Sequence, residues 1–258
     1  MIDIEIARKV HNTMSWKYWA GSVASKSLDW VSRPGKPLAK LPFPFGHNVY
    51  LDLRRFFPNC QLIVDCGANV GDTVVAYRNH FPKARIDAFE PVAANFDRLR
   101  KRLASDENAH PIPLGCGSQK EEVAIALSSD PERHSLSGVA SPTGETEKIS
   151  LTDLDSFYDS EGKDYVIDIL KIDVEGFELK VLEGAKDLLQ RRRIRSIFAE
   201  VGFHHNQPGR TYFGDLNDLL LAKSYAFSGL YNQFRWGAKR EVYFANALWL
   251  LSDADHSK

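Results

Sequence analysis

The sequence has 258 residues, of which 43% are hydrophobic and 26% charged, the balance of a soluble globular chain that can bury a core without disulfide or metal staples. Its 33 basic and 34 acidic residues give a net charge of -1, which argues against nucleic acid as a partner because non-specific binding to phosphates needs a basic field. Three cysteines without a CxxC pair argue against a disulfide framework and a thiolate zinc site, and they favour a reducing, cytoplasmic location.

The first 48 residues differ in composition from the rest of the chain. They contain Trp16, Trp19 and Trp30, followed by a proline-rich run at residues 33–46. This pattern predicts one or two short helices and a stiff connector. The N-terminus lacks the apolar core of a secretory signal, and no apolar stretch approaches the roughly 18 residues of a membrane span. We expect residues 1–48 to pack on a main domain of residues 49–258; alternatively, the aromatic side chains recognise a ligand or a partner.

From residue 61 onward, short apolar runs alternate with segments of helical spacing. Strands are predicted at residues 61–66, 84–89, 110–115, 166–173, 196–201, 226–233 and 246–252, and helices at residues 73–81, 93–104, 178–190 and 213–225. Residues 121–129 and 148–154 are predicted as extra strands or a hairpin around a polar loop that contains His134. The alternation predicts a doubly wound α/β sheet with helices on both faces, and the last two strands predict an edge hairpin.

A glycine-bearing turn, DCGANVGDT at residues 65–73, separates the first strand from the first helix. In a doubly wound sheet, ligands bind at the carboxyl ends of the strands, where the strand order reverses. Gly67 and Gly71 are expected to allow a tight turn and the close approach of a ligand, so that Gly67→Val abolishes ligand binding and leaves the fold intact. The spacing matches neither the G-x-G-x-x-G of dinucleotide sites nor a P-loop, so a nicotinamide cofactor fits poorly.

A second signal is Glu90, which ends the second predicted strand 25 residues after Asp65. An acid at this strand end is where dinucleotide and adenosyl ligands have their ribose hydroxyls bound. Together with the glycine turn, Glu90 therefore predicts a ribose-binding position.

These residues and the segment ILKIDVEGFELKVLEGA at residues 169–185 resemble the FkbM-type family of S-adenosylmethionine-dependent methyltransferases. The resemblance covers roughly residues 61–202, through DCGANVGDT, AFEP followed by Asn95, and FAEV at residues 198–201. It implies a class I methyltransferase (Rossmann-like) sheet of about seven strands with an antiparallel last strand. It also implies S-adenosyl-L-methionine as cofactor and O-methylation of a small-molecule or glycan acceptor, such as a sugar or polyketide-type natural product.

The resemblance also implies roles for individual positions. The glycine turn is expected around the methionine part of the cofactor, Glu90 at the ribose, and the Gly-Cys-Gly segment around Cys116 at the adenine. The implied cofactor-binding set is Asp65, Gly67, Ala68, Asn69, Gly71, Thr73, Glu90, Pro91, Asn95, Cys116 and Asp173.

Acids at the end of the fourth strand are the candidates nearest the transferred methyl group. We expect Asp173 to act at the active site, Glu178 to interact with its helix N-terminus, and Lys171 to pair with an acid of this cluster. An alcohol acceptor benefits from a general base or a metal. The predicted catalytic set is Asp173, Glu200, His204 and His205.

Two alternatives, a cation site and a non-catalytic role, stay open from the sequence, and the basic run is considered with them. Asp173, Glu200 and His204 are a possible site for a divalent cation. The basic run at residues 191–193 is expected to be solvated at the end of a helix rather than to bind nucleic acid. The second alternative is a non-catalytic nucleotide-binding module that recognises a partner through its aromatic N-terminal arm.

Overall fold

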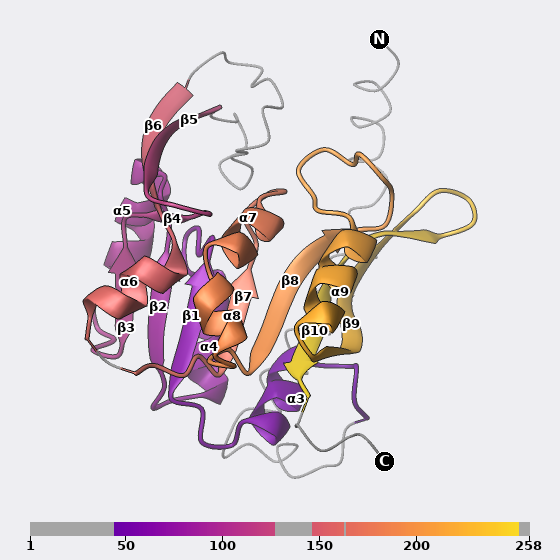
Figure 1. Ribbon diagram of the computed structural model, residues 1–258, viewed down its shortest axis with the longest axis horizontal. Coiled ribbons are helices and arrows are strands. Elements are labelled where there is room, and N and C mark those ends of the chain that lie inside the picture. Colours follow the sequence, from indigo (N-terminus) through magenta and orange to yellow (C-terminus); the bar gives the residue numbers. More distant parts are fainter. Residues whose placement is uncertain (1–43, 127–145, 163, 253–258) are drawn as a thin grey trace.

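The computed structural model describes residues 44–126, 146–162 and 164–252. Within these ranges the chain forms a seven-stranded sheet with helices on both faces and a separate three-stranded sheet (Figure 1). The N-terminal tryptophans and His134 lie outside the described residues, so the predictions made for them stay predictions. None of the described helices has the length and the hydropathy needed to cross a membrane.

The large sheet has the strand order β3-β2-β1-β7-β8-β10-β9. Its neighbours run parallel, except that β10 is antiparallel to both β8 and β9. This order confirms the predicted doubly wound sheet with an antiparallel last strand and an edge hairpin. The strands are β1 (Leu62–Cys66), β2 (Arg85–Phe89), β3 (Ala109–Ile112), β7 (Ile169–Ile172), β8 (Ser196–Gly202), β9 (Tyr225–Trp236) and β10 (Glu241–Leu251).

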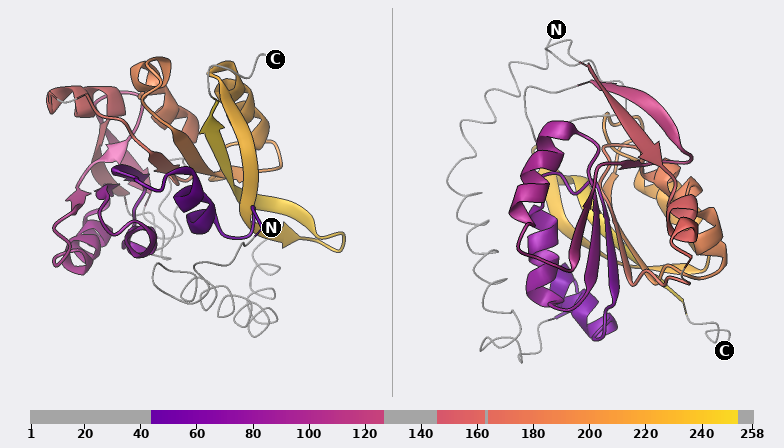
Figure 2. Two further views of the ribbon diagram at one scale, coloured as in Figure 1. Left: turned by 90° about the horizontal axis from the view of Figure 1, so that it is seen from below. Right: turned by 90° about the vertical axis from the view of Figure 1, so that its left-hand side faces the viewer.

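The central strands are buried on both faces, which explains their nearly continuous apolar sequences. Helices cover one face of the sheet with α3 (Val49–Phe56), α4 (Asp72–His80) and α5 (Ala93–Arg102). The other face carries α6 (Leu154–Ser160), α7 (Glu178–Glu183), α8 (Lys186–Gln190) and α9 (Phe213–Ala222) (Figure 2). The connection from β1 leads to β2 on one side and the connection from β7 leads to β8 on the other, so the strand order reverses between β1 and β7.

The small sheet consists of β4 (Gly115–Cys116), β5 (Glu121–Ala126) and β6 (Thr146–Thr152) in the order β4-β6-β5. Strands β5 and β6 pair antiparallel, which confirms the predicted hairpin. Their buried residues Ile125 and Ile149 pack with Val92, which follows β2. The hairpin is therefore fixed beside the carboxyl end of the large sheet.

The prediction of one helix over residues 178–190 is wrong, because α7 ends at Glu183 and α8 begins at Lys186. Gly184 lies at the break, where a Cβ atom would be 2.0 Å from the carbonyl oxygen of Gly117. The Gly184 carbonyl accepts a hydrogen bond from the Asp155 amide instead of continuing a helix. The basic run at residues 191–193 directly follows α8, at the predicted helix end.

The sequence patterns did not predict helices α3 and α6. Each begins with a capping side chain: Asn48 accepts a hydrogen bond from the Leu51 amide, and Asp153 accepts one from the Ser156 amide. Helix α6 also shortens the strand predicted at residues 148–154, because β6 ends at Thr152. The capping residues were the signal that could have located both helices.

Candidate functional site

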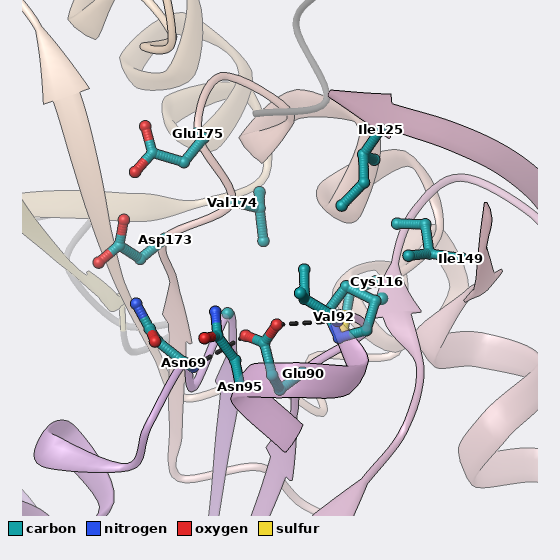
Figure 3. Close-up of a pocket in the computed structure, with 13 residues that line it drawn as sticks. Asn69, Glu90, Val92, Asn95, Cys116, Ile125, Ile149, Asp173, Val174 and Glu175 are labelled. Carbon is teal, nitrogen blue, oxygen red and sulfur yellow. Dashed lines mark hydrogen bonds between the residues drawn. The ribbon is translucent and has the colours of Figure 1, made fainter. Parts of the chain in front are cut away.

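A cavity opens at the carboxyl ends of β1, β2 and β7, next to the point where the strand order reverses (Figure 3). This is the position at which open α/β sheets bind ligands. Its walls come from six segments that are separate in sequence but meet at this edge. They are Gly67, Asn69, Glu90, Pro91, Val92, Asn95, Gly115, Cys116, Ile125, Ile149, Asp173, Val174 and Glu175.

Glu90 lies on the floor of the cavity, and both of its carboxylate oxygens are held by backbone amides. The Asn69 amide donates to Oε2 and the Val92 amide donates to Oε1, each at 2.9 Å (Figure 3). Burial raises the pKa of Glu90 to about 7, although these two hydrogen bonds lower it. The carboxylate is thus fixed in orientation, and it titrates near neutral pH.

The glycine turn is shaped by contacts within the protein. At Gly67, φ is +83° and a Cβ atom would lie 1.9 Å from the carbonyl oxygen of Asp173. At Gly71, φ is +87° and a Cβ atom would lie 2.8 Å from Leu99. The positive φ values confirm the predicted tight turn. Protein atoms occupy the space that a Cβ atom would need at either glycine, and because Gly67 lines the cavity, the close approach of a ligand there stays a prediction. Because this space is occupied, Gly67→Val cannot leave the fold intact.

Asp65 lies beneath the turn and lines neither the cavity nor the shallow hollow beside it. Its Oδ2 accepts a hydrogen bond from the Thr73 hydroxyl at 2.5 Å, and its Oδ1 lies 2.9 Å from Lys171 Nζ. The shallow hollow is lined by residues of the turn that include Ala68 and Thr73. Gly71 lines neither space.

One wall of the cavity is apolar. Ile125 and Ile149 of the small sheet face Val92, and the buried thiol of Cys116 lies at the same end (Figure 3). Burial raises the pKa of Cys116 well above its ordinary value, so the thiol stays neutral and adds to the apolar surface. Such a wall suits a flat, weakly polar ring.

The opposite wall is the loop that follows β7. Glu175 and Gly176 have positive φ values of +53° and +97°. Glu178 holds this loop, because its Oε1 accepts hydrogen bonds from the Val174 and Gly176 amides at 3.3 and 3.1 Å. Asp173, whose side chain is 37% exposed, faces the cavity from the start of the loop.

Glu200 belongs to β8, one strand further along the same edge, and it does not line the cavity. Its Oε2 lies 3.0 Å from Nε of Arg210, and the Arg210 guanidinium lies over the ring of Phe244 at 4.0 Å from the centroid. Burial, and then the negative charge of Asp173, raise the pKa of Glu200 to about 8, whereas Arg210 lowers it. Glu200 is consequently a carboxyl group that exchanges a proton near neutral pH.

The two predicted catalytic histidines are exposed in the loop after β8. His205 packs on Tyr212 with ring centroids 3.9 Å apart, and His204 lies 5.5 Å from the Tyr243 ring. Neither histidine lines the cavity. Across the residues that the structure describes, no three His, Cys, Asp or Glu side chains are gathered around a metal position, so the alternative cation set of Asp173, Glu200 and His204 is not assembled.

The structure therefore brings together seven of the predicted cofactor residues around one cavity: Gly67, Asn69, Glu90, Pro91, Asn95, Cys116 and Asp173. Sequence reasoning did not identify Val92, Ile125, Ile149 or Val174 as lining residues. Ile125 and Ile149 come from an insertion whose position over the cavity no local pattern reveals. Val92 and Val174 directly follow predicted residues, so their adjacency was an available signal.

The chain is similar in sequence to known methyltransferases. The sequence model of the family described as "Methyltransferase FkbM domain" matches residues 65–228. The chain is 27% identical over 176 residues to "Methyltransferase 1" of Beauveria bassiana, a match that covers 58% of this chain and 70% of the relative. It is 30% identical over 161 residues to "Methyltransferase sdnD" of Sordaria araneosa, covering 50% of this chain and 62% of the relative.

Among solved structures, the fold is similar to that of methyltransferase FkbM from Methylobacillus flagellatus KT, with a TM-score of 0.51 and 17% identity. That match covers 86% of this chain and 47% of the solved chain, so the matched part spans less than half of the solved one. At this identity the likeness concerns the fold alone.

Proposed function

The chain belongs to the FkbM methyltransferase family, and from this premise we propose that it is an S-adenosyl-L-methionine-dependent O-methyltransferase. The observation that carries the proposal is the cavity around Glu90, with one apolar and one acidic wall at the reversal point of the sheet. The acceptor proposed is a hydroxyl of a sugar, a glycan or a polyketide-type natural product.

The cavity fits the three chemical parts of the cofactor. Glu90 is placed to accept hydrogen bonds from ribose hydroxyls, because backbone amides already fix both of its oxygens. The wall of Val92, Ile125 and Ile149 suits the adenine ring. Among the described residues, the buried Oδ1 of Asn69 has no hydrogen-bond partner, which leaves an acceptor for the amino group of the methionine part.

The cofactor supplies a methyl group on a positively charged sulfur, and this charge disappears when the methyl group is transferred. Asp173 faces the cavity with a partly exposed carboxylate, which favours binding of the cation over the neutral product. Holding the acceptor oxygen in line with the methyl group supplies much of the rate.

The acceptor hydroxyl must lose its proton as its oxygen bonds to the methyl carbon. We propose that Glu200 accepts this proton as the general base, because its pKa of about 8 lies close to neutral pH. Its pairing with Arg210 restricts the carboxyl group to one orientation. The charge of Asp173, which lines the cavity, raises the pKa of Glu200, and this coupling supports the assignment.

Calorimetric titration with S-adenosylmethionine, S-adenosylhomocysteine and NAD tests the proposal directly. We expect binding of the first two and none of NAD. A methyl-transfer screen of hydroxyl acceptors then follows, with arms that contain a divalent cation or a chelator. Binding of NAD alone would contradict the cofactor assignment, and no binding of any of the three would favour the non-catalytic module.

A further inference from the structure

Lys171 is a charged residue buried at the centre of the sheet, directly under the cavity. It belongs to β7, is 3% exposed, and is the register partner of Asp65 in β1. Its neighbour two positions on, Asp173, follows β7 on the same side. Strand pairing therefore gathers one ammonium and two carboxylates at the carboxyl edge of the two central strands.

The ammonium group contacts three oxygen atoms. Lys171 Nζ donates a hydrogen bond to the carbonyl oxygen of Gly67 at 2.9 Å. It lies 2.9 Å from Oδ1 of Asp65 and 3.5 Å from Oδ2 of Asp173. Of these three contacts, the one to the Gly67 carbonyl is a hydrogen bond, and the two carboxylates interact with the ammonium group as ion pairs.

Lys171 stays charged in this position. Burial lowers its pKa, but the carboxylates of Asp65 and Asp173 raise it by more, and the pKa stands above its ordinary value. The positive charge therefore keeps the Gly67 carbonyl oxygen and the two carboxylates close to the ammonium group.

Two of the three oxygens belong to the segments that form the proposed methionine side of the cavity, and the third belongs to Asp65 within β1. Gly67 begins the turn after β1, and Asp173 begins the loop after β7. Lys171 itself does not line the cavity, and its side chain is 4% exposed against 37% for that of Asp173. Lys171 lines only the shallow hollow beside the cavity, whereas Gly67 and Asp173 line the cavity itself.

We propose that Lys171 is a positioning residue, which holds the Asp173 carboxylate and the Gly67 turn in the geometry that binds the positively charged end of S-adenosylmethionine. This inference rests on the proposed function and adds the residue that organises the site. The role is distinct from contact with the cofactor and from stabilisation of the fold alone.

A charge-balanced double variant separates positioning from stability. Lys171→Met alone leaves Asp65 buried without its cation, and we expect it to be strongly destabilised. The double variant Asp65→Asn/Lys171→Met removes one charge of each sign, so the net charge near Asp173 is unchanged. We expect its thermal stability to recover toward wild type while its calorimetric affinity for S-adenosylmethionine stays at least about tenfold weaker.

A control comes from an ion pair at the opposite end of the same strands, in which Asp168 is buried and the Arg195 side chain is 48% exposed. Arg195 Nη1 lies 2.7 Å from Oδ1 of Asp168, which precedes β7. We expect the double variant Asp168→Asn/Arg195→Met to bind S-adenosylmethionine as the wild type does. A second readout is hydrogen exchange in the unliganded protein, where amides 67–71 should lose protection in the Lys171 double variant and keep it in the control.

Each outcome decides the inference. Wild-type affinity in a folded Asp65→Asn/Lys171→Met variant would overturn the positioning role and leave the proposed function standing. If the wild type itself bound no S-adenosylmethionine, the proposed function would fail. Hydrogen exchange would still report on the turn, and unchanged protection of amides 67–71 would overturn the positioning role by itself.

Discussion

The two halves of the candidate site are built differently. The half proposed to bind the cofactor, here the cofactor half, is formed by turns that directly follow β1, β2 and β7, and its carboxylate Glu90 is fixed by the backbone amides of Asn69 and Val92. The half proposed to bind the acceptor, here the acceptor half, joins β8, the loop after it and β10 through side chains, as in the pairing of Glu200 with Arg210 over Phe244. Backbone-fixed groups leave little room for variation, whereas side-chain contacts allow one fold to serve different acceptors.

The largest effect is expected where the cofactor half is packed most tightly. Gly67→Ala places a Cβ atom against the Asp173 carbonyl and should cost about 3 kcal/mol or more of unfolding free energy. Gly237→Ala is the control, because Gly237 has a φ of +76° but open space around it, and should cost about 1 kcal/mol. Denaturant unfolding measures both, and equal losses would mean that φ alone matters at Gly67.

In the acceptor half, Glu200→Gln should lower kcat by about 100- to 10,000-fold and leave the affinity for S-adenosylmethionine unchanged. The ionised carboxyl is the active form, and its pKa is about 8, so wild-type kcat/KM should rise with pH up to about 8 and then level off. The variant should lack this rise. A full pH dependence in Glu200→Gln would assign the base elsewhere.

In the cofactor half, Glu90→Gln should weaken S-adenosylmethionine binding by about 10- to 100-fold, since it loses a charged acceptor and turns an amide NH₂ toward a backbone N–H. Wild-type affinity should fall as the pH drops below about 7, where Glu90 becomes protonated. Glu147→Gln is the control, because Glu147 accepts a hydrogen bond from the Ala93 amide but does not line the cavity. Calorimetry across pH 5.5–8.5 separates the two variants.

The raised pKa of Glu90 also affects stability. The folded state binds the Glu90 proton more tightly than the unfolded state does, so between pH 4.5 and about 7 this group lowers the unfolding free energy as the pH rises. Glu90→Gln should remove that contribution. Thermal unfolding of the unliganded protein at pH 5 and pH 7 measures it, and an unchanged pH slope in the variant would exclude Glu90 as its source.

A smaller effect is expected from the apolar wall. Ile125→Ala removes side-chain surface from the small sheet and should weaken S-adenosylmethionine binding about threefold to tenfold. The matched control is Val123→Ala, on the same strand but outside the cavity lining. If both variants bind equally, the hairpin does not contact the adenine ring.

The smallest effect is expected from the exposed histidines. His204→Gln and His205→Gln should each change kcat/KM by less than about twofold, because both side chains lie outside the cavity. A loss of 100-fold in either variant would show that the acceptor half closes around a histidine when substrate binds.

The sequence alone determined the succession of the main strands along the chain, the glycine turn and the acid at the end of β2. These features are local, because the end of a buried strand and the turn that follows it are adjacent in the chain, and parallel strands place such ends at one edge. For the same reason seven of the eleven predicted cofactor residues lie on one cavity, and the family was identified from the same residues.

Tertiary structure alone decided the remaining features. Contact between Gly184 and the Gly117 carbonyl breaks the predicted long helix. Asp65 is turned away from the cavity because its register partner is Lys171. Ile125 and Ile149 belong to the small sheet and line the cavity from there. The pKa of Glu200 is raised by acids that follow β7, such as Asp173. Each of these is set by residues far apart in the chain, whose distance and burial no local pattern records.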